Sequence, residues 1–422
     1  MRVYLDTLGC RLNAAESEEL ARRFLGAGCT LVHAPAEAEV IVLNTCAVTA
    51  QAAKRSRHRL RALHRASPHA QIAAIGCWVT VHPHEVRDYP GVSWVLPNAE
   101  KAHAVERILG RTADPAPWRP GVWRHTRVFL GVQDGCDHAC TYCITRVLRG
   151  PARSRPLDEV VRSVQTLVAQ DAQEVVLTGV SLGAYGHDLG RSEGLAELVA
   201  ALLDRTEVPR LRLSSIEPWD VSDALLRQWE NPRLCRQLHI PLQSGSDRVL
   251  RRMGRRITTT AFSELVARAR DFVPEMAVTT DVLVGFPGET EAAFEESLAF
   301  VEELAFARLH VFRYSERAGT PAVRLPGRVP HRVRTARSKR MRRLGRRLSA
   351  AYRKRFVGRV LPVLWEQRDA EGRWHGLTDT YLAVTTCSED DLYNRITPVR
   401  LCAVEGRSLV GEVCSQGSDL PR

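Results

Sequence analysis

The chain has no apolar run of the roughly 18 residues that a membrane-spanning helix requires. Its first ten residues, MRVYLDTLGC, lack the uninterrupted apolar stretch of a signal peptide. These two absences favour a protein of the reducing cytoplasm, and we expect that location. With 44% hydrophobic and 26% charged residues, the composition argues against disorder as the main state. A length of 422 residues predicts roughly two to four domains.

A disulfide framework is not expected either, because the 11 cysteines are an odd number and the compartment is reducing. Cysteines then indicate ligation of a metal or a cluster. Six of them fall into two groups described below. We interpret the other five as structural or incidental: Cys29, Cys235, Cys387, Cys402 and Cys414.

Acidic residues are missing from residues 331–355, which hold ten Arg and two Lys. This segment alone carries the whole net charge of +12, and a second basic cluster lies at 54–65. A single cluster is ordinarily a solvated helix face. A long run without any acid needs counter-ions, which phosphates can supply. The pattern favours nucleic acid as a partner, with an acidic membrane surface as the alternative.

The first 110 residues alternate strand-like and helix-like patterns, which predicts a parallel sheet. Each of the three strand-like segments runs directly into a cysteine, at Cys10, Cys46 and Cys77. The carboxyl ends of parallel strands share one edge, where ligands bind in open α/β folds. We therefore expect these three thiols to converge. Three separate buried core cysteines are the alternative.

Residues 112–125 are proline-rich and predict a linker. Six strand-like segments separated by helical patterns follow, which indicates an open or partial barrel. They lie at 127–132, 174–179, 210–215, 238–243, 278–286 and 308–315. The basic segment then predicts a helix, and the end of the chain has the alternation of a small antiparallel barrel.

The predicted fold class is thus α/β with four parts. They are a doubly wound parallel-sheet domain over 1–115, a partial (βα)6 barrel over 122–325, a basic helical connector over 326–357 and a small antiparallel β-barrel over 358–418.

The motif CDHACTYC places Cys136, Cys140 and Cys143 just after the first barrel strand. Three close thiolates can hold three irons of a 4Fe–4S cluster, which leaves the fourth iron open to a ligand. The alternative is zinc with His138 as fourth ligand, but zinc sites ordinarily use paired C-x-x-C units.

This cysteine spacing resembles that of the radical S-adenosylmethionine (SAM) enzymes. The resemblance implies that the amine and carboxylate of SAM bind the open iron. Electron transfer then cleaves SAM to methionine and a 5′-deoxyadenosyl radical. A cluster in the mouth of a barrel suits that chemistry, because the barrel can exclude water.

The motifs TLGCRLN, LNTCAVT, AAIGC and CTYCITRVLRGPARSR resemble the methylthiotransferases within that superfamily. This implies a second cluster on Cys10, Cys46 and Cys77 and a C-terminal RNA-binding TRAM barrel. The segments LTGVSLGAYG, HIPLQSGSDRVLRRM and DVLVGFPGET are most similar to the branch that acts on threonylcarbamoyladenosine at position 37 of tRNA. Two departures are Arg146, where proline is common, and Thr380, where asparagine is common.

The resemblance also implies a set of SAM contacts at strand ends. They are Tyr142, Thr178, Gly179, Glu217, Gln243, Ser244 and Gly285. Glu217 would contact the ribose and Gly285 would allow close approach of the adenine. Thr178 and Gly179 would meet the methionine amine through the backbone. Simple packing of Tyr142, an ordinary glycine turn at Gly179 and a helix N-terminal acid at Glu217 are the alternatives.

The implied reaction transfers a methylthio group to carbon 2 of the modified adenine. One SAM would methylate a sulfur of the N-terminal cluster and a second would be cleaved. Carbon 2 carries an unactivated aromatic C–H bond, which a radical can functionalise. The expected partners are the tRNA anticodon loop, which is already single-stranded, and a small electron-donor protein of the flavodoxin or ferredoxin type. We expect a monomer.

Three other functions are compatible with the same motifs. The first is the same methylthiolation on isopentenyladenosine in tRNA or on an aspartate of a ribosomal protein. The second is a non-catalytic iron–sulfur sensor that binds RNA. The third is a redox-inert zinc protein.

Overall fold

The computed structural model describes residues 1–121 and 126–414. Its N-terminal part is a five-stranded sheet in which every neighbouring pair of strands is parallel. In order across the sheet, the strands are β2 (Thr30–Leu31), β1 (Arg2–Thr7), β3 (Val40–Thr45), β4 (Gln71–Gly76) and β5 (Val92–Leu96). Alternate side chains of a strand point to opposite faces, so both faces need a cover. One face packs on α1 (Arg11–Gly26) and α5 (Ala104–Leu109), and the other packs on α2 (Ala50–Ala66) and α3 (Cys77–Val81). The predicted doubly wound sheet is confirmed.

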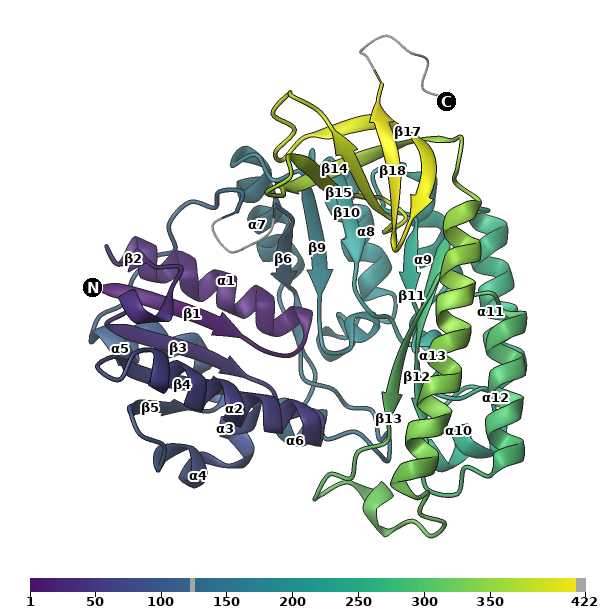
Figure 1. Cartoon of the computed structure of the whole chain (residues 1–422), viewed down its shortest axis with the longest axis horizontal. Helices are drawn as coiled ribbons and strands as arrows, with labels where there is room; N and C mark the ends of the chain where they lie inside the picture. Colours follow the sequence, from purple (N-terminus) through teal and green to yellow (C-terminus); the bar gives the residue numbers. More distant parts are fainter. Residues whose placement is uncertain (122–125, 415–422) are drawn as a thin grey trace.

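The central part contains six parallel strands in one row (Figure 1). They are β6 (Val128–Gly131), β9 (Glu174–Thr178), β10 (Arg210–Leu213), β11 (Gln237–His239), β12 (Ala277–Val284) and β13 (Arg308–Arg313). Two three-stranded sheets form the row, and parallel bridges such as Ser215 to His239 join β10 to β11. The partial barrel is therefore confirmed. Strand β11 is shorter than predicted because Pro241 has no N–H to donate to a ladder.

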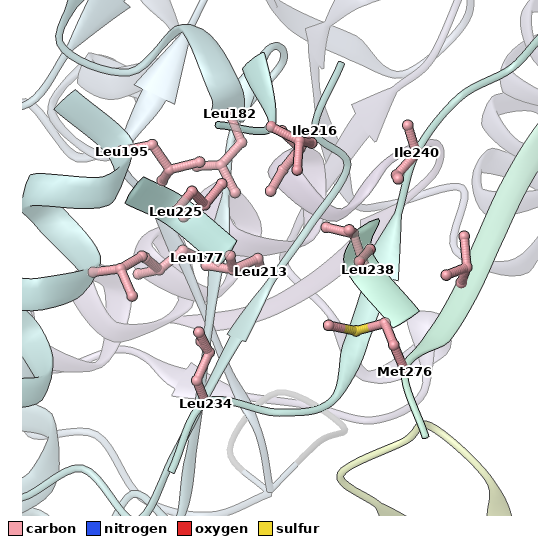
Figure 2. Packing of buried hydrophobic residues seen from close by; sticks show 14 of the residues in the cluster. Leu177, Leu182, Leu195, Leu213, Ile216, Leu225, Leu234, Leu238, Ile240 and Met276 are labelled. Atoms are coloured by element: carbon pink, nitrogen blue, oxygen red, sulfur yellow. The ribbon is translucent and has the colours of Figure 1, made fainter. Parts of the chain in front are cut away.

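One face of this row is apolar and packs against helices. Leu177, Leu213 and Leu238 lie on it, and Figure 2 shows them among the buried leucines of this core. The helices that cover it include α7 (Leu157–Ala169), α8 (Gly194–Arg205), α11 (Thr259–Phe272) and α12 (Glu291–Glu303). In each strand, the residues directly before and after these leucines point to the opposite face of the row. We call this face the lumen. Helix α1 covers the lumen side of β6 and β9 through Ala15, Phe129 and Val176.

The basic segment forms one long helix, α13 (His331–Lys354), as predicted. Part of the counter-charge that this segment needs comes from the protein itself, because α12 and the turn before it supply acids. Three ion pairs join these elements, namely Arg337–Glu289 at 2.7 Å, Arg340–Glu295 at 2.6 Å and Arg347–Glu302 at 2.5 Å. A separate exposed stripe consists of Arg332, Lys339, Arg343 and Arg346. No acid among the described residues pairs with this stripe.

The C-terminal strands close into a barrel with the order β14-β15-β16-β18-β17. Their bounds are β14 (Val360–Arg368), β15 (Arg373–Thr378), β16 (Ala383–Cys387), β17 (Ile396–Glu405) and β18 (Ser408–Val413). The barrel core contains Trp365, Val399 and Leu409, and it packs on Tyr352 and Phe356 at the end of α13. The predicted small antiparallel barrel is confirmed, although one strand pair, β16 with β18, is parallel.

This barrel docks on the amino ends of the central strands (Figure 1). Arg212 donates to the carbonyls of Thr378 (3.1 Å) and Asp379 (2.8 Å), and its side chain also pairs with Glu174 at 2.6 Å. Tyr381 has a positive φ of 67° and lies within 5.5 Å of the guanidinium groups of Arg11, Arg127 and Arg212. All three parts of the chain therefore meet at one tyrosine.

The predicted linker is packed against the protein where it is described. The Trp118 ring is buried, and its Nε1 donates to the Glu18 carboxylate at 2.6 Å. Residues 122–125 of that linker and the last predicted residues of the C-terminal domain, 415–418, lie outside the described residues. Within 1–121 and 126–414, no helix is both long and apolar enough to cross a membrane.

Candidate active site

The first thiol group lies at the carboxyl edge of the N-terminal sheet. Strands β1, β3 and β4 are neighbours, and Cys10, Cys46 and Cys77 follow their ends. The turn before Cys10 passes so close to Cys46 that a Cβ on Gly9 would lie 2.9 Å from the Cys46 Sγ. Gly9 also has a φ of 109°, which only glycine adopts readily. The sequence therefore allows the thiols to approach by keeping side-chain volume out of this turn.

Each of these thiols is free, since no cysteine of the chain forms a disulfide. Burial, with the neighbouring thiols of Cys77 and Cys10, raises the pKa of Cys46 to about 11. A thiol in such a place ionises only when a cation compensates it, and the irons of a cluster do so. Three neighbouring cysteine sulfurs, with Cys46 and Cys77 buried and Cys10 exposed, fit a 4Fe–4S cluster with one iron left for another ligand.

Two asparagines organise this edge, and the sequence pattern did not reveal either. Asn13 Nδ2 donates to the carbonyls of Leu8 (2.7 Å) and Thr45 (3.1 Å), so it ties the Cys10 turn to the end of β3. Asn98 Nδ2 lies 3.4 Å from the Cys77 Sγ and donates to the carbonyl of Leu148 at 2.8 Å. The signal that could have found Asn13 is its place three residues after Cys10, at the start of a helix.

The second thiol group lies in the loop between β7 (Gln133–Asp134) and α6 (Thr145–Arg149). The Cys136 N–H donates to the Gly150 carbonyl at 3.1 Å, and the Thr141 N–H donates to the Met253 carbonyl at 2.9 Å. The loop is thus fixed at its start and its middle. Burial raises the pKa of Cys136 to about 11 and also raises the pKa of Cys140. The set of three cysteines again fits a 4Fe–4S cluster.

Arg255 lies against this second group. Its Nη1 is 4.0 Å from the Cys140 Sγ, and its Nη2 pairs with the Glu217 carboxylate at 2.6 Å. The guanidinium also sits 4.7 Å from the ring centre of Trp219. A buried cation beside three thiolates offsets part of their negative charge. Sequence reasoning named Glu217 and missed Arg255, which is distant in the chain and belongs to no cysteine motif.

Helix α6 connects the two thiol groups. It begins two residues after Cys143, and its last residue, Arg149, reaches the first group. Arg149 Nη2 donates to the Asn13 Oδ1 at 2.6 Å, while Nη1 pairs with Glu16 at 3.0 Å and with Asp134 at 2.9 Å. The neighbouring Leu148 carbonyl accepts from Asn98, which also contacts Cys77. One short helix therefore contacts Cys143 of the second set directly and is joined to the first set through Asn13 and Asn98.

Among the predicted SAM contacts, Tyr142 packs edge-on against Phe286, with ring centres 6.4 Å apart. The Thr178 carbonyl accepts from the Val132 N–H at 2.9 Å. A Cβ on Gly179 would lie 2.8 Å from the Gln133 Oε1 and 3.1 Å from its Cβ, so the glycine lets Gln133 pack closely against this turn. These three residues lie near the second thiol group, and each has a packing role there.

The remaining predicted contacts divide into two kinds. Gln243 has a φ of 73° and its N–H donates to the Asp281 carbonyl at 2.8 Å, which places it at the end of the β11–β12 pair. The Ser244 hydroxyl lies 3.1 Å from the Ser297 hydroxyl of α12, so the structure engages it in the helix layer rather than at the mouth. A Cβ on Gly285 would lie 2.2 Å from Arg334, so a protein side chain makes the close approach expected of adenine.

The two sequence departures have simple structural outcomes. Arg146 is exposed on α6, and the helix forms without a proline at that position. Thr380 is buried, and its hydroxyl lies 2.8 Å from that of Thr378. Its side chain therefore stabilises the docked loop and is not on the barrel surface.

Comparison with known proteins identifies the family. A model described as the radical SAM superfamily matches residues 130–301, and one described as uncharacterized protein family UPF0004 matches residues 2–96. The chain is 37% identical over 394 residues to a threonylcarbamoyladenosine tRNA methylthiotransferase of Thermotoga maritima, covering 90% of each chain. It is 34% identical to the protein of the same name from Bacillus subtilis, covering 94% of this chain and 93% of the relative. The chain belongs to the radical SAM methylthiotransferase family.

Other methylthiotransferases are similar at comparable identity. A ribosomal protein uS12 methylthiotransferase of Anaeromyxobacter is 37% identical, covering 88% of this chain and 82% of the relative. Among solved structures, the radical SAM methyltransferase TsrM of Kitasatospora setae matches with a TM-score of 0.54 at 15% identity, covering 76% of this chain and 77% of that one. That match shows the fold alone. The family is therefore shown, and identity by itself does not separate the substrates.

Membership fixes the cofactors of this methylthiotransferase as SAM and 4Fe–4S clusters, as predicted. Among the described residues, two sets of three cysteines have the donor chemistry to hold the clusters. That these six residues are the ligands remains a proposal.

Proposed function

We propose that this methylthiotransferase transfers a methylthio group to carbon 2 of threonylcarbamoyladenosine at position 37 of tRNA. The relatives from Thermotoga maritima and Bacillus subtilis are named for this activity, and their matches cover nine-tenths or more of this chain. The closed C-terminal barrel and the basic stripe on α13 suit an RNA partner.

The observation that carries the proposal is the joining of the two thiol groups by α6. Arg149 contacts Asn13 beside Cys10, and Asn98 contacts both Leu148 and Cys77. A methylthiolation needs a sulfur source next to a radical source. A non-catalytic sensor needs neither the second group nor its attachment to a barrel mouth.

Different parts of the chain would hold the clusters, form the SAM site and exclude water. Cys136, Cys140 and Cys143 would hold the cluster that would supply the electron for SAM cleavage, and Cys10, Cys46 and Cys77 would hold the cluster that would supply sulfur. The Arg255–Glu217 ion pair would form part of the wall of the SAM site, and the partial barrel would exclude water from the reacting carbon. Overall, the hydrogen on carbon 2 leaves in 5′-deoxyadenosine and an S–CH3 group replaces it, with the methyl drawn from a second SAM.

The partners follow from the same proposal. The anticodon loop would present an already unstacked base, which costs less than extracting one from a duplex. A small flavodoxin- or ferredoxin-type protein would deliver the electrons. The enzyme would act as a monomer, and we assign the four domain boundaries given above to it.

Nucleoside mass spectrometry tests this function. Anaerobically reconstituted protein is incubated with SAM, sulfide, dithionite and tRNA that carries threonylcarbamoyladenosine. We expect that nucleoside to gain the mass of one methylthio group in place of one hydrogen, and the Cys136→Ala variant to show no gain. Cleavage of SAM without any gain on that nucleoside would move the substrate to another tRNA base or to a ribosomal protein.

A further inference from the structure

The lumen holds a polar cluster that the cysteine chemistry does not use. His239, Asp281 and His310 lie on the adjacent strands β11, β12 and β13. Their chain neighbours Leu238, Val282 and Val311 all pack in the helix-facing core. Because successive side chains of a strand alternate, the three polar residues point into the lumen.

The three side chains are in direct contact. Asp281 Oδ1 lies 3.3 Å from the His239 Nε2 and 3.4 Å from the His310 Nδ1. Against the effect of burial, these two imidazoles hold the pKa of Asp281 well below its usual range, so its carboxylate is charged at neutral pH. The His239 Nδ1 lies 2.9 Å from the Thr279 hydroxyl, which fixes that ring. His310 uses Nδ1 on Asp281, so its Nε2 is available to a ligand.

Two further observations indicate that the cluster faces a ligand. Gln237 Oε1 and Ser214 Oγ, on the same lumen side, are buried and have no hydrogen-bond partner among the described residues. Leaving such groups unpaired is unfavourable, and a polar ligand that bonds them would remove that cost. The His310 side chain is 40% exposed, so the cluster can be reached.

An exposed aromatic ring accompanies the cluster. Phe312 is two residues after His310 on β13, so both side chains leave the strand on the same face. It is 44% exposed, which is unusual for a phenylalanine on a barrel strand. Proteins that bind unstacked bases commonly stack them on such rings.

We propose that Asp281 and His310 read the polar side chain of the modified adenine, with Asp281 oriented by His239, while Phe312 stacks on a base. This inference rests on the proposed function and specifies how its substrate is recognised. The threonylcarbamoyl group carries a carboxylate, a hydroxyl and urea-type N–H groups. The His310 Nε2 can accept from the hydroxyl or an N–H of this group, and the Asp281 carboxylate can accept from its N–H groups.

The same chemistry predicts discrimination. An isopentenyl side chain is a pure hydrocarbon, so it would leave the buried groups of the lumen unpaired. A site built to hydrogen-bond its substrate rejects an analogue that lacks those groups far more strongly than an apolar pocket rejects an extra methylene. The polar lumen therefore favours threonylcarbamoyladenosine over isopentenyladenosine.

A divalent metal is the competing occupant. Two histidines and one carboxylate are a common ligand set for zinc and iron, and here the ligand atoms lie within 4.8 Å of one another. The open lumen position and Phe312 favour the substrate as the occupant, and the experiment below separates the two.

The experiment compares three anticodon stem-loops that carry threonylcarbamoyladenosine, isopentenyladenosine or unmodified adenosine at position 37. Reconstituted wild-type enzyme and the variants His310→Gln, Asp281→Asn and Phe312→Leu are assayed for kcat and KM. His310→Gln and Asp281→Asn are expected to raise KM for the first stem-loop at least about tenfold, the loss expected when a buried polar group loses its hydrogen-bond partner. KM for unmodified adenosine and uncoupled SAM cleavage should stay unchanged. Phe312→Leu should raise KM for all three stem-loops alike.

The control variant is His103→Gln, which alters an exposed histidine of the N-terminal part. Cluster absorbance and the unfolding temperature show whether each variant is folded, and His239→Asn serves as a second variant if one is not. Unchanged preference among the stem-loops in His310→Gln and His239→Asn would overturn the inference. A zinc site would overturn it too. In that case wild-type holoenzyme would retain one equivalent of zinc, and His310→Gln would lose both the zinc and the activity on every stem-loop.

Binding of the free nucleoside separates this inference from the proposed function. Threonylcarbamoyladenosine is titrated into holoenzyme with SAM present and without reductant. Binding that is weakened by His310→Gln, with no methylthio transfer by the wild type, would contradict the proposed reaction and support the recognition. Methylthio transfer by the wild type, with unaltered nucleoside binding in His310→Gln, would support the proposed reaction and contradict the recognition by His310.

Discussion

Arg149 donates a 2.6 Å hydrogen bond from Nη2 to the Oδ1 of Asn13, although the two residues lie 136 positions apart in the chain. The Arg149 side chain is almost fully buried and also pairs with Glu16 and Asp134. This contact joins the helix after the second thiol group to the turn that carries Cys10. Together with Asn98, which bonds the Leu148 carbonyl and contacts Cys77, this guanidinium fixes the relative placement of the two groups.

Replacing Arg149 by lysine should uncouple the two halves of the reaction. Lysine keeps the charge but cannot bond Asn13, Glu16 and Asp134 together in the planar geometry of a guanidinium. We expect methylthio transfer to fall at least about tenfold while reductive SAM cleavage persists, because small misplacements of reacting groups are costly. The assay measures 5′-deoxyadenosine and methylthiolated nucleoside in one reaction. Arg146→Lys, on the exposed side of the same helix, is the control, and an equal loss of both products in Arg149→Lys would contradict this role.

The exposed stripe of α13 should contribute to RNA binding, whereas its paired arginines should not. Replacing Lys339, Arg343 and Arg346 by glutamine removes cations that have no acidic partner in the described chain. We expect the slope of log K against log salt for tRNA to decrease by about 0.7–0.9 for each phosphate that the variant no longer neutralises. Replacing Arg340 and Arg347, which pair with α12 acids, is the matched control and should leave the slope unchanged. Equal slopes for both variants would place the RNA elsewhere.

Glu18 should make the stability of the protein depend on pH. Burial raises its pKa to about 7, although the Trp118 indole donates to it. The native state therefore holds the Glu18 proton more tightly than the unfolded chain does. The contribution of Glu18 to the free energy of unfolding is fully present below pH 4.5 and is lost as the pH rises to about 7. Glu18→Gln mimics the protonated form, and its stability relative to wild type should increase by about 2–3 kcal/mol between pH 5 and pH 8. Denaturant unfolding at the two pH values measures this, and a pH-independent difference would count against it.

Glu174 should hold the C-terminal barrel on the central strands. It is fully buried and pairs with Arg212, whose other N–H groups donate to the Thr378 and Asp379 carbonyls. Against the effect of burial, Arg212 and two neighbouring arginines lower the pKa of Glu174 to about 2, so it stays charged at working pH. Glu174→Gln would leave buried guanidinium charge uncompensated, which costs about 3–5 kcal/mol. Limited proteolysis should release the barrel faster in this variant than in Glu371→Gln, an exposed control, and equal rates would contradict the assignment.

Much of the fold could be predicted because its signals are local. Strand-like runs that end in Cys10, Cys46 and Cys77 predict a shared sheet edge, and the structure brings these residues there. The roles of Arg149, Arg255 and Asn98 could not be predicted, because each depends on contacts between distant segments. The pairing of α13 with α12 was missed for the same reason, since charge counted along the chain ignores acids on a neighbouring helix. Gly285 and Ser244 show that a motif glycine or serine can serve packing within the protein.

A competition assay tests the proposed substrate of this enzyme most directly. One reaction would contain reconstituted enzyme with equal amounts of two anticodon stem-loops, carrying threonylcarbamoyladenosine and isopentenyladenosine, and the ribosomal protein substrate named for the uS12 relatives. Mass spectrometry would then follow methylthio gain on all three. We expect gain on the threonylcarbamoyladenosine stem-loop alone. Preferential gain on either of the other substrates would contradict it.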